Sequence, residues 1–254
     1  MIGLLGRKIG MTQLFDGDGR RTPVTLIQTG PCTVLGVKKK DKDGYDAVQL
    51  GFGERKEKRT SRAVLGQFKK LGLPPRRFVR EIRTSELEGL EVGQELKLNQ
   101  FEAGEFVDVE GVSIGKGFQG VVKRHHFRGG PKSHGSMFGR VAGSIGASSF
   151  PSRVVKGMRM PGQMGNQKVT TQNLKVMKVD VENGILAVKG AVPGTESGYV
   201  VIRTALKRGK EKKWQIEKPK DEARPAEKAE SQPARAASAE AKPEPVKESP
   251  APKA

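Results

Sequence analysis

Residues 174–189 read LKVMKVDVENGILAVK and contain the strongest strand signal of the chain. Apolar residues alternate with polar ones in Leu174–Val181 and return in Ile185–Lys189. Glu182-Asn183-Gly184 stands between the two runs, and Asn-Gly in this place favours a hairpin because both residues tolerate positive φ angles. The stretch therefore predicts two antiparallel strands and a protein that is mainly β structure.

Similar short runs recur on both sides of this hairpin. They are Leu4–Phe15, Val24–Gln28, Thr33–Lys38, Asp46–Phe52 and Tyr199–Leu206, and turn residues such as Asp16-Gly17-Asp18-Gly19 separate them. Several short strands at this spacing predict a small barrel. Few helices are expected, and one is predicted at Ser61–Leu71, where apolar residues lie close to one stripe before Gly72.

The charge of the chain favours a polyanionic partner. The chain has 254 residues and a formal net charge of +19, whereas net charges of about 2–8 suffice for solubility. Residues 217–254 carry eight cations and eight anions, so the whole surplus lies on residues 1–216. This tail is built from Ala, Pro, Lys, Glu and Ser, and we predict that it is disordered.

The compartment is inferred from three features. A single cysteine, Cys32, excludes an internal disulfide. The first residues have no cation ahead of a short apolar stretch, unlike a signal peptide. No apolar run approaches the roughly 20 residues of a membrane span. We therefore expect a cytoplasmic protein without a membrane partner.

Residues 111–179 contain no Asp or Glu, many glycines and twelve Lys or Arg residues. From Arg128 to Gln167 we find neither helical nor strand periodicity, which in so long a segment calls for a functional reason. Folded RNA supplies one, because its phosphates surround the chain, repel carboxylates and attract arginines. Residues 111–167 are therefore predicted to be a basic extension that penetrates RNA.

Other chemistry for this segment is disfavoured. Gly115-Lys116-Gly117-Phe118-Gln119-Gly120 matches a dinucleotide-binding pattern, but no acidic residue follows until Asp180. A flexible turn close to phosphates is the better interpretation. His125, His126 and His134 have no cysteine or carboxylate nearby in the sequence, so we predict neither a metal site nor a catalytic one. Base stacking, phosphate contact and a plain surface role remain open for them.

Four motifs together resemble a known family. They are GLLGRKIGMT at residues 3–12, GKGFQGVVKRHHFRGGP at 115–131, GSIG at 143–146 and MPGQMGN at 160–166. Their order and length are similar to the universal large-subunit ribosomal protein "L three" family in its bacterial form. The resemblance covers roughly Met1 to Leu206.

The resemblance implies a translation-factor-like β-barrel interrupted by a long basic, glycine-rich loop. On this basis residues 1–110 and 168–216 form the barrel domain, with a small helical insertion near 61–72, and residues 111–167 form the extension. It implies a structural protein that binds large-subunit rRNA near its 3′ end, helps to start subunit assembly and extends a loop toward the peptidyl transferase centre. Neighbouring ribosomal proteins are the other expected partners. No cofactor, small-molecule substrate or catalytic residue is implied.

The expected contacts fall into two groups. RNA binding is expected at Arg7, Lys8, Lys116, Lys123, Arg124, His125, His126, Arg128, Lys132, His134, Arg140, Arg153, Lys156, Arg159, Gln163, Asn166 and Lys168. The loop tip near the peptidyl transferase centre is expected at Gly143, Ser144, Ile145, Gly146, Ala147, Ser148, Ser149 and Phe150. Many bacterial relatives carry a glutamine in this tip that is methylated, and the sequence here has none, so the resemblance implies no such modification.

Two rival functions come from other classes. A free RNA chaperone or nucleoid-type binder would share the charge but would not need the ordered motifs. An enzyme built on a barrel with a glycine-rich loop would need carboxylates that this segment lacks.

Overall fold

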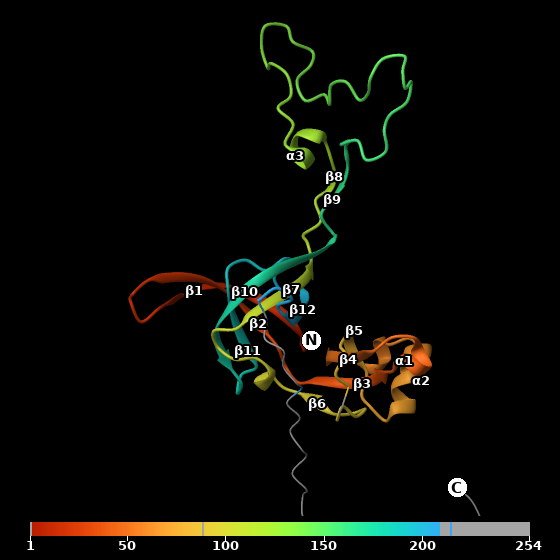
Figure 1. Ribbon diagram of the computed structural model, residues 1–254, viewed down its shortest axis with the longest axis vertical. Coiled ribbons are helices and arrows are strands. Elements are labelled where there is room, and N and C mark those ends of the chain that lie inside the picture. Colours follow the sequence, from red (N-terminus) through yellow and green to blue (C-terminus); the bar gives the residue numbers. More distant parts are fainter. Residues whose placement is uncertain (1, 88, 209–213, 215–254) are drawn as a thin grey trace, which may run out of the picture. The chain divides into compact units, whose positions relative to one another are not determined.

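The computed structural model describes residues 2–87, 89–208 and 214, which form mainly β strands with three short α-helices (Figure 1). The mainly β class predicted from the sequence is confirmed. The tail predicted at residues 217–254 lies outside the described residues.

Six antiparallel strands close into a barrel. In order of pairing they are β1 (Gly3–Phe15), β12 (Tyr199–Thr204), β7 (Phe106–Val112), β10 (Lys168–Asp180), β11 (Ile185–Lys189) and β2 (Arg21–Gln28). Closure joins β1 to β12, with Leu5 opposite Val201. A closed barrel has no edge strand with unpaired backbone groups. The predicted barrel is confirmed. It is closed by β1 and β12, which are far apart in the sequence.

The predicted hairpin is β10–β11, in which Asp180 pairs with Ile185. Gly184 has a φ of +64°, and a Cβ there would lie 2.9 Å from the carbonyl oxygen of Thr29. The Asp180 carboxylate accepts hydrogen bonds from the side-chain and backbone nitrogens of Asn183, at 2.8 and 3.2 Å. These bonds hold the pKa of Asp180 below its usual value. The hairpin is therefore present where the sequence predicted it, but of the two turn residues only Gly184 has a positive φ, and Asn183 contributes through its hydrogen bonds to Asp180.

Between β2 and β7 in the sequence, four further strands form a second sheet. Its strands, in order of pairing, are β5 (Arg76–Arg83), β4 (Ala47–Glu54), β3 (Cys32–Lys38) and β6 (Glu95–Leu96). Leu50 and Ile82 of this sheet belong to the same buried cluster as Leu4 and Ile202 of the barrel. The sheet and the barrel therefore share one hydrophobic core.

Short helices lie between the strands of the second sheet and between that sheet and β7. They are α1 (Lys40–Asp43), the 3₁₀ turns η1 (Glu57–Arg59) and η2 (Leu98–Gln100), and α2 (Arg62–Leu71). Helix α2 is the predicted helix, and it ends at Gly72 with a φ of +67°. Only Phe68 of its apolar stripe is buried, whereas Val64 and Leu71 stay exposed.

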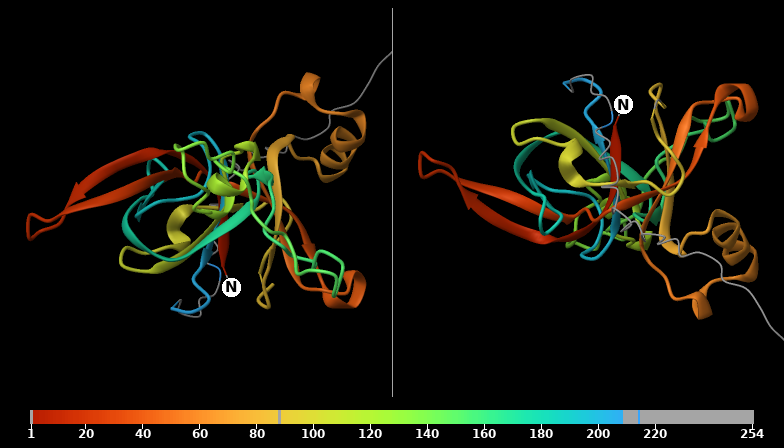
Figure 2. Two further views of the ribbon diagram at one scale, coloured as in Figure 1. Left: turned by 90° about the horizontal axis from the view of Figure 1, so that it is seen from above. Right: turned by 90° about the horizontal axis from the view of Figure 1, so that it is seen from below.

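The β1–β2 pair extends beyond the barrel. Residues of β1 after Arg7 pair with β2 alone, and the two strands continue as a ribbon (Figure 2). Met11 and Phe15 on this ribbon are exposed.

Cys32 is fully buried, and its sulfur lies 3.4 Å from both the backbone nitrogen and the carbonyl oxygen of Leu5. Burial raises the pKa of this thiol to about 12, so it stays protonated at neutral pH. Across residues 2–87, 89–208 and 214, no group of three or more His, Cys, Asp or Glu could hold a metal ion. Within the same residues, no helix is long and apolar enough to cross a membrane.

Candidate nucleic-acid interface

The predicted extension leaves the barrel from two neighbouring strands. Strand β7 ends at Val112, which pairs with Lys168 at the start of β10. Asp108 of β7 is buried and accepts hydrogen bonds from the backbone nitrogens of Asn173 (2.8 Å) and Leu206 (3.2 Å). This carboxylate ties β7 to β10 and to the segment after β12, so the base of the extension is fixed in the barrel.

A narrow paired segment follows, which we call the neck (residues 113–119 and 162–167). The backbone nitrogen of Ser113 donates to Gln167 O at 2.9 Å, and that of Lys116 donates to Met164 O at 2.9 Å. Strands β8 (Gly117–Gln119) and β9 (Gly162–Met164) continue the pairing. The neck therefore carries the antiparallel ladder of the barrel outward.

Gly165 is the tightest point of the neck. Its φ is +72°, and a Cβ there would overlap the carbonyl oxygen of Ile114. Moving the backbone of Ile114 would break the neck's hydrogen bonds, so only glycine fits this position.

Helix α3 (Val121–His125) lies beyond β8 and contacts the returning segment just before β9. Arg124 Nη1 donates to Met160 O at 2.7 Å, and His125 Nε2 lies 3.1 Å from the same oxygen. These two predicted RNA-binding residues therefore contact the protein's own backbone, and both are half-buried.

Residues 126–161 form no helix or strand. Within this segment the backbone nitrogen of Gly130 donates to Gly139 O at 2.9 Å, which closes a loop of the chain. Ser144 Oγ donates to Gly146 O at 2.8 Å within the predicted tip. From Arg128 to Gln167, where the sequence has no regular periodicity, the only regular element in this described stretch is the three-residue strand β9.

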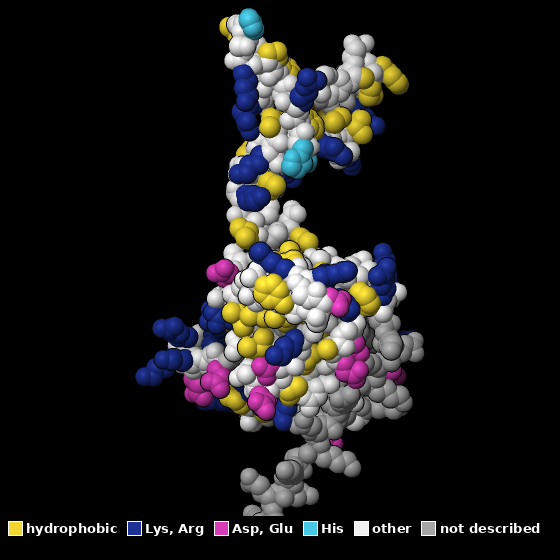
Figure 3. Space-filling view, turned by 90° about the vertical axis from the view of Figure 1, so that its left-hand side faces the viewer, with side chains coloured by type: hydrophobic (Ala, Val, Ile, Leu, Met, Phe, Trp, Pro, Cys, Tyr) yellow, Lys and Arg dark blue, Asp and Glu magenta, His cyan; other side chains and the backbone are white. Residues whose placement is uncertain are grey.

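The exposed surface of the extension is cationic. Most predicted contacts are exposed: Arg7, Lys116, Lys123, His126, Arg128, Lys132, His134, Arg140, Arg153, Lys156, Arg159, Gln163, Asn166 and Lys168. Figure 3 shows Lys and Arg side chains over the extension and acidic side chains only on the globular part. The structure thus brings the cations of residues 116–159 together on one projecting segment.

Two predicted contacts already have partners in the barrel. Lys8 Nζ donates to Val192 O at 2.8 Å and Gly194 O at 3.2 Å. Lys168 Nζ lies 2.8 Å from Glu110 Oε1. Lys8 therefore holds the loop before β12, and its charge is less available to a ligand than that of the exposed Arg7.

Exposed apolar side chains on the extension were not predicted as a group. Met137 and Phe150 are 98% and 89% exposed, and Phe138, Val141, Ile145, Val155 and Met158 are also exposed. Water-exposed apolar groups in a cationic segment suit contact with the faces of bases. The sequence could have indicated this group, because its apolar residues lie in a region without helical or strand periodicity.

Amide hydrogen exchange of the free protein tests whether this extension orders itself. We expect fast exchange across Arg140–Arg159, because few backbone hydrogen bonds occur there, and slow exchange in β10 and β11. Strong protection across Arg140–Arg159 without RNA would contradict this expectation.

Comparison with known proteins gives a consistent result. A family model described as "Ribosomal protein L3" matches residues 86–184. The "Large ribosomal subunit protein uL3" of Brachyspira pilosicoli is 49% identical over 213 residues, which are 84% of this chain and 98% of the relative. Proteins of the same description from Alkaliphilus metalliredigens and Solibacter usitatus are 51% and 55% identical, over 83% and 79% of this chain and 100% and 97% of their own lengths.

Proposed function

Because the chain belongs to the ribosomal protein L3 family, and is thus a structural constituent of the large ribosomal subunit rather than an enzyme, we propose that its extension anchors it directly in large-subunit rRNA. In this proposal the globular part binds near the 3′ end of the rRNA and helps to start subunit assembly. The extension runs toward the peptidyl transferase centre. Membership of the family also places the chain in the ribosome, in the cytoplasm.

One observation supports the proposal above the others. The extension carries exposed cations without any acidic residue between positions 111 and 179. A cation that meets an RNA phosphate releases a condensed counterion, which favours binding. A carboxylate in the same place would be repelled. The composition therefore suits a segment that is surrounded by phosphates along its length.

The two ends of the extension have different parts in this proposal. The neck fixes the direction in which the extension leaves the barrel, through backbone hydrogen bonds at Ser113 and Lys116. The tip, Gly143–Phe150, carries no charge. The tip would contribute little to rRNA affinity, and its role would depend on its position relative to the peptidyl transferase centre. Changes in the tip should therefore alter ribosome function more than rRNA affinity.

A crosslinking experiment tests the placement of the tip. A photoreactive residue at Ser148, which is exposed, should crosslink in assembled large subunits to rRNA of the peptidyl transferase centre. The same group at Lys42 of α1, also exposed, should give crosslinks elsewhere. Crosslinks from Ser148 that fall only on rRNA far from the reaction centre would refute the proposal.

A further inference from the structure

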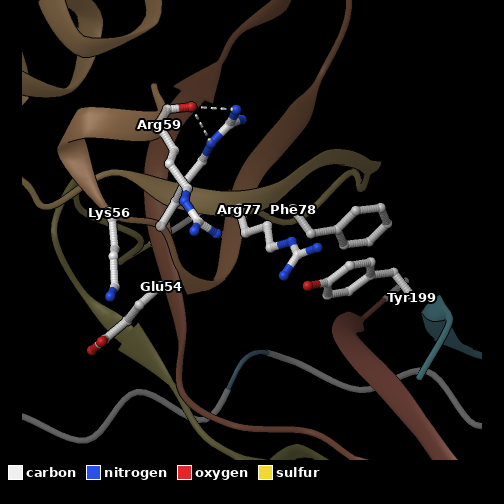
Figure 4. A pocket seen from close by; sticks show the side chains of 7 residues that line it. Glu54, Lys56, Arg59, Arg77, Phe78 and Tyr199 are labelled. Carbon is white, nitrogen blue, oxygen red and sulfur yellow. Dashed lines mark hydrogen bonds between the residues drawn. The ribbon is translucent and has the colours of Figure 1, made fainter. Parts of the chain in front are cut away.

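A second group of cations lies on the globular part, away from the extension. A cavity of about 520 Å³ opens there (Figure 4). It is lined by Glu54, Arg55, Lys56, Arg59, Arg77, Phe78 and Tyr199. These residues come from the end of β4, from the loop that leads into η1, from η1, from β5 and from the start of β12, and none belongs to residues 111–167.

The loop after β4 holds Arg55 in a fixed position. Its backbone nitrogen donates to Pro75 O at 3.1 Å. Its guanidinium donates twice to the carbonyl oxygen of Arg59, from Nη2 at 2.7 Å and from Nε at 3.2 Å, as the dashed lines in Figure 4 mark. Because two bonds orient this guanidinium, less conformational entropy is lost when a ligand binds it.

Aromatic rings form the other wall of the cavity. Phe78 stacks on Tyr199, with ring centroids 4.8 Å apart and an angle of 14° between the planes. The guanidinium carbon of Arg77 lies 5.8 Å from the centroid of the Tyr199 ring, and Figure 4 shows Arg77 beside the hydroxyl end of that ring. A cation near an aromatic ring is partly desolvated and held in place, which suits the planar guanidinium of arginine.

The charges of the cavity are unbalanced. Four cations line it, and Glu54 is its one acidic lining residue. Among the ion pairs between described residues, none involves Arg55, Lys56, Arg59 or Arg77. Like charges gathered in this way repel one another, and a bound anion relieves that repulsion.

We propose that this cavity holds a backbone phosphate of the rRNA and forms a second anchor, separate from the extension. The proposal rests on the rRNA binding proposed above and deepens it by naming the residues through which the globular part contacts a phosphate. Oriented guanidinium groups match phosphate oxygens in pairs, and the half-buried rings beside them suit an adjoining ribose or base. A free phosphate shares the anionic chemistry but makes no use of the aromatic wall.

The test compares two double variants of the full chain. Lys56→Gln with Arg59→Gln removes two exposed cations of the cavity and leaves the Arg59 carbonyl that holds Arg55. Lys40→Gln with Lys42→Gln removes two exposed cations of α1. These lysines alternate with Asp41 and Asp43, so their local charge is already balanced.

The probe is full-length bacterial large-subunit rRNA, with affinity measured over a range of salt concentrations. The cavity variant should bind more weakly, and its salt slope should shrink by roughly 0.7–0.9 for each lost phosphate contact. The α1 variant should keep the slope of the unmodified chain. An unchanged slope in the cavity variant would overturn the proposal.

Two further arms separate other ligands. Inorganic phosphate and an acidic peptide are each titrated against both double variants and the unmodified chain. Loss of peptide binding in the cavity variant, with rRNA binding intact, would assign the cavity to a protein partner and overturn the proposal. Loss of inorganic phosphate binding in the cavity variant, with rRNA binding intact, would assign the cavity to free phosphate and would also overturn the proposal. If variants of the extension lower the salt slope and the cavity variant does not, the second anchor fails while the proposed function stands.

Discussion

Replacement of Gly165 by alanine is expected to open the neck and to weaken rRNA binding. A Cβ at this position overlaps the carbonyl oxygen of Ile114, and the φ of +72° is itself unfavourable for a side chain. The strained backbone costs roughly 1–3 kcal/mol, and the overlap adds a penalty of about 1–3 kcal/mol. The neck relieves both by separating its two strands, so the extension loses its fixed direction.

Hydrogen exchange of the neck amides measures this opening directly. The amides of Ser113, Lys116 and Asn166, which donate across the neck, should exchange faster in the variant, while β11 keeps its protection. Gly157→Ala is the matched control, since Gly157 has a φ of +84° but no atom within 4 Å of an added Cβ. Equal neck protection in the two variants would show that the contact with Ile114 is unimportant.

The local parts of the fold were predictable because their signals lie in adjacent residues. Asn183-Gly184 fixed the β10–β11 turn, and Gly72 marked the end of α2. Both glycines have positive φ angles, which few other residues adopt. The preference of glycine for positive φ is a local property, so the sequence alone was sufficient to place this turn and this helix end.

The assignment of strands to sheets was not predictable from local patterns. Leu5 of β1 pairs with Val201 of β12 across almost the whole described chain. β3 and β4 resemble barrel strands in their alternation but pair with β5 and β6 instead. Long-range pairing is decided by packing of the complete core, which a single strand does not encode.

The candidate interface was predictable as a segment but not residue by residue. The lack of acidic residues predicted that residues 111–167 face RNA, and the structure shows this segment as an exposed cationic extension. Lys8, Arg124 and His125 share the sequence context of the other candidates but contact carbonyl oxygens of the protein itself. Tyr199 reaches the cationic cavity from a strand more than a hundred residues away from Arg77. Such contacts arise only in the folded chain.

Replacement of Arg153 and Arg159 together by glutamine is expected to reduce rRNA affinity without unfolding the barrel. Both side chains are exposed on the extension, and none of the ion pairs between described residues involves either one. Glutamine keeps a polar side chain and removes the charge. The salt slope should shrink by roughly 0.7–0.9 for each lost contact, and sequence preference should change little because phosphate contacts carry no base information.

The outcome depends on where the lost charges act. Exposed residues outside the core contribute little to stability, so the variant should melt at nearly the same temperature as the unmodified chain. The α1 variant, Lys40→Gln with Lys42→Gln, removes the same number of charges from the globular part and should leave the slope unchanged. If both double variants lowered the slope equally, the net charge of the chain would explain binding, and the extension would need no phosphates around it. If only the Arg153 and Arg159 variant does so, the acid-free composition of the extension has its explanation in direct phosphate contact.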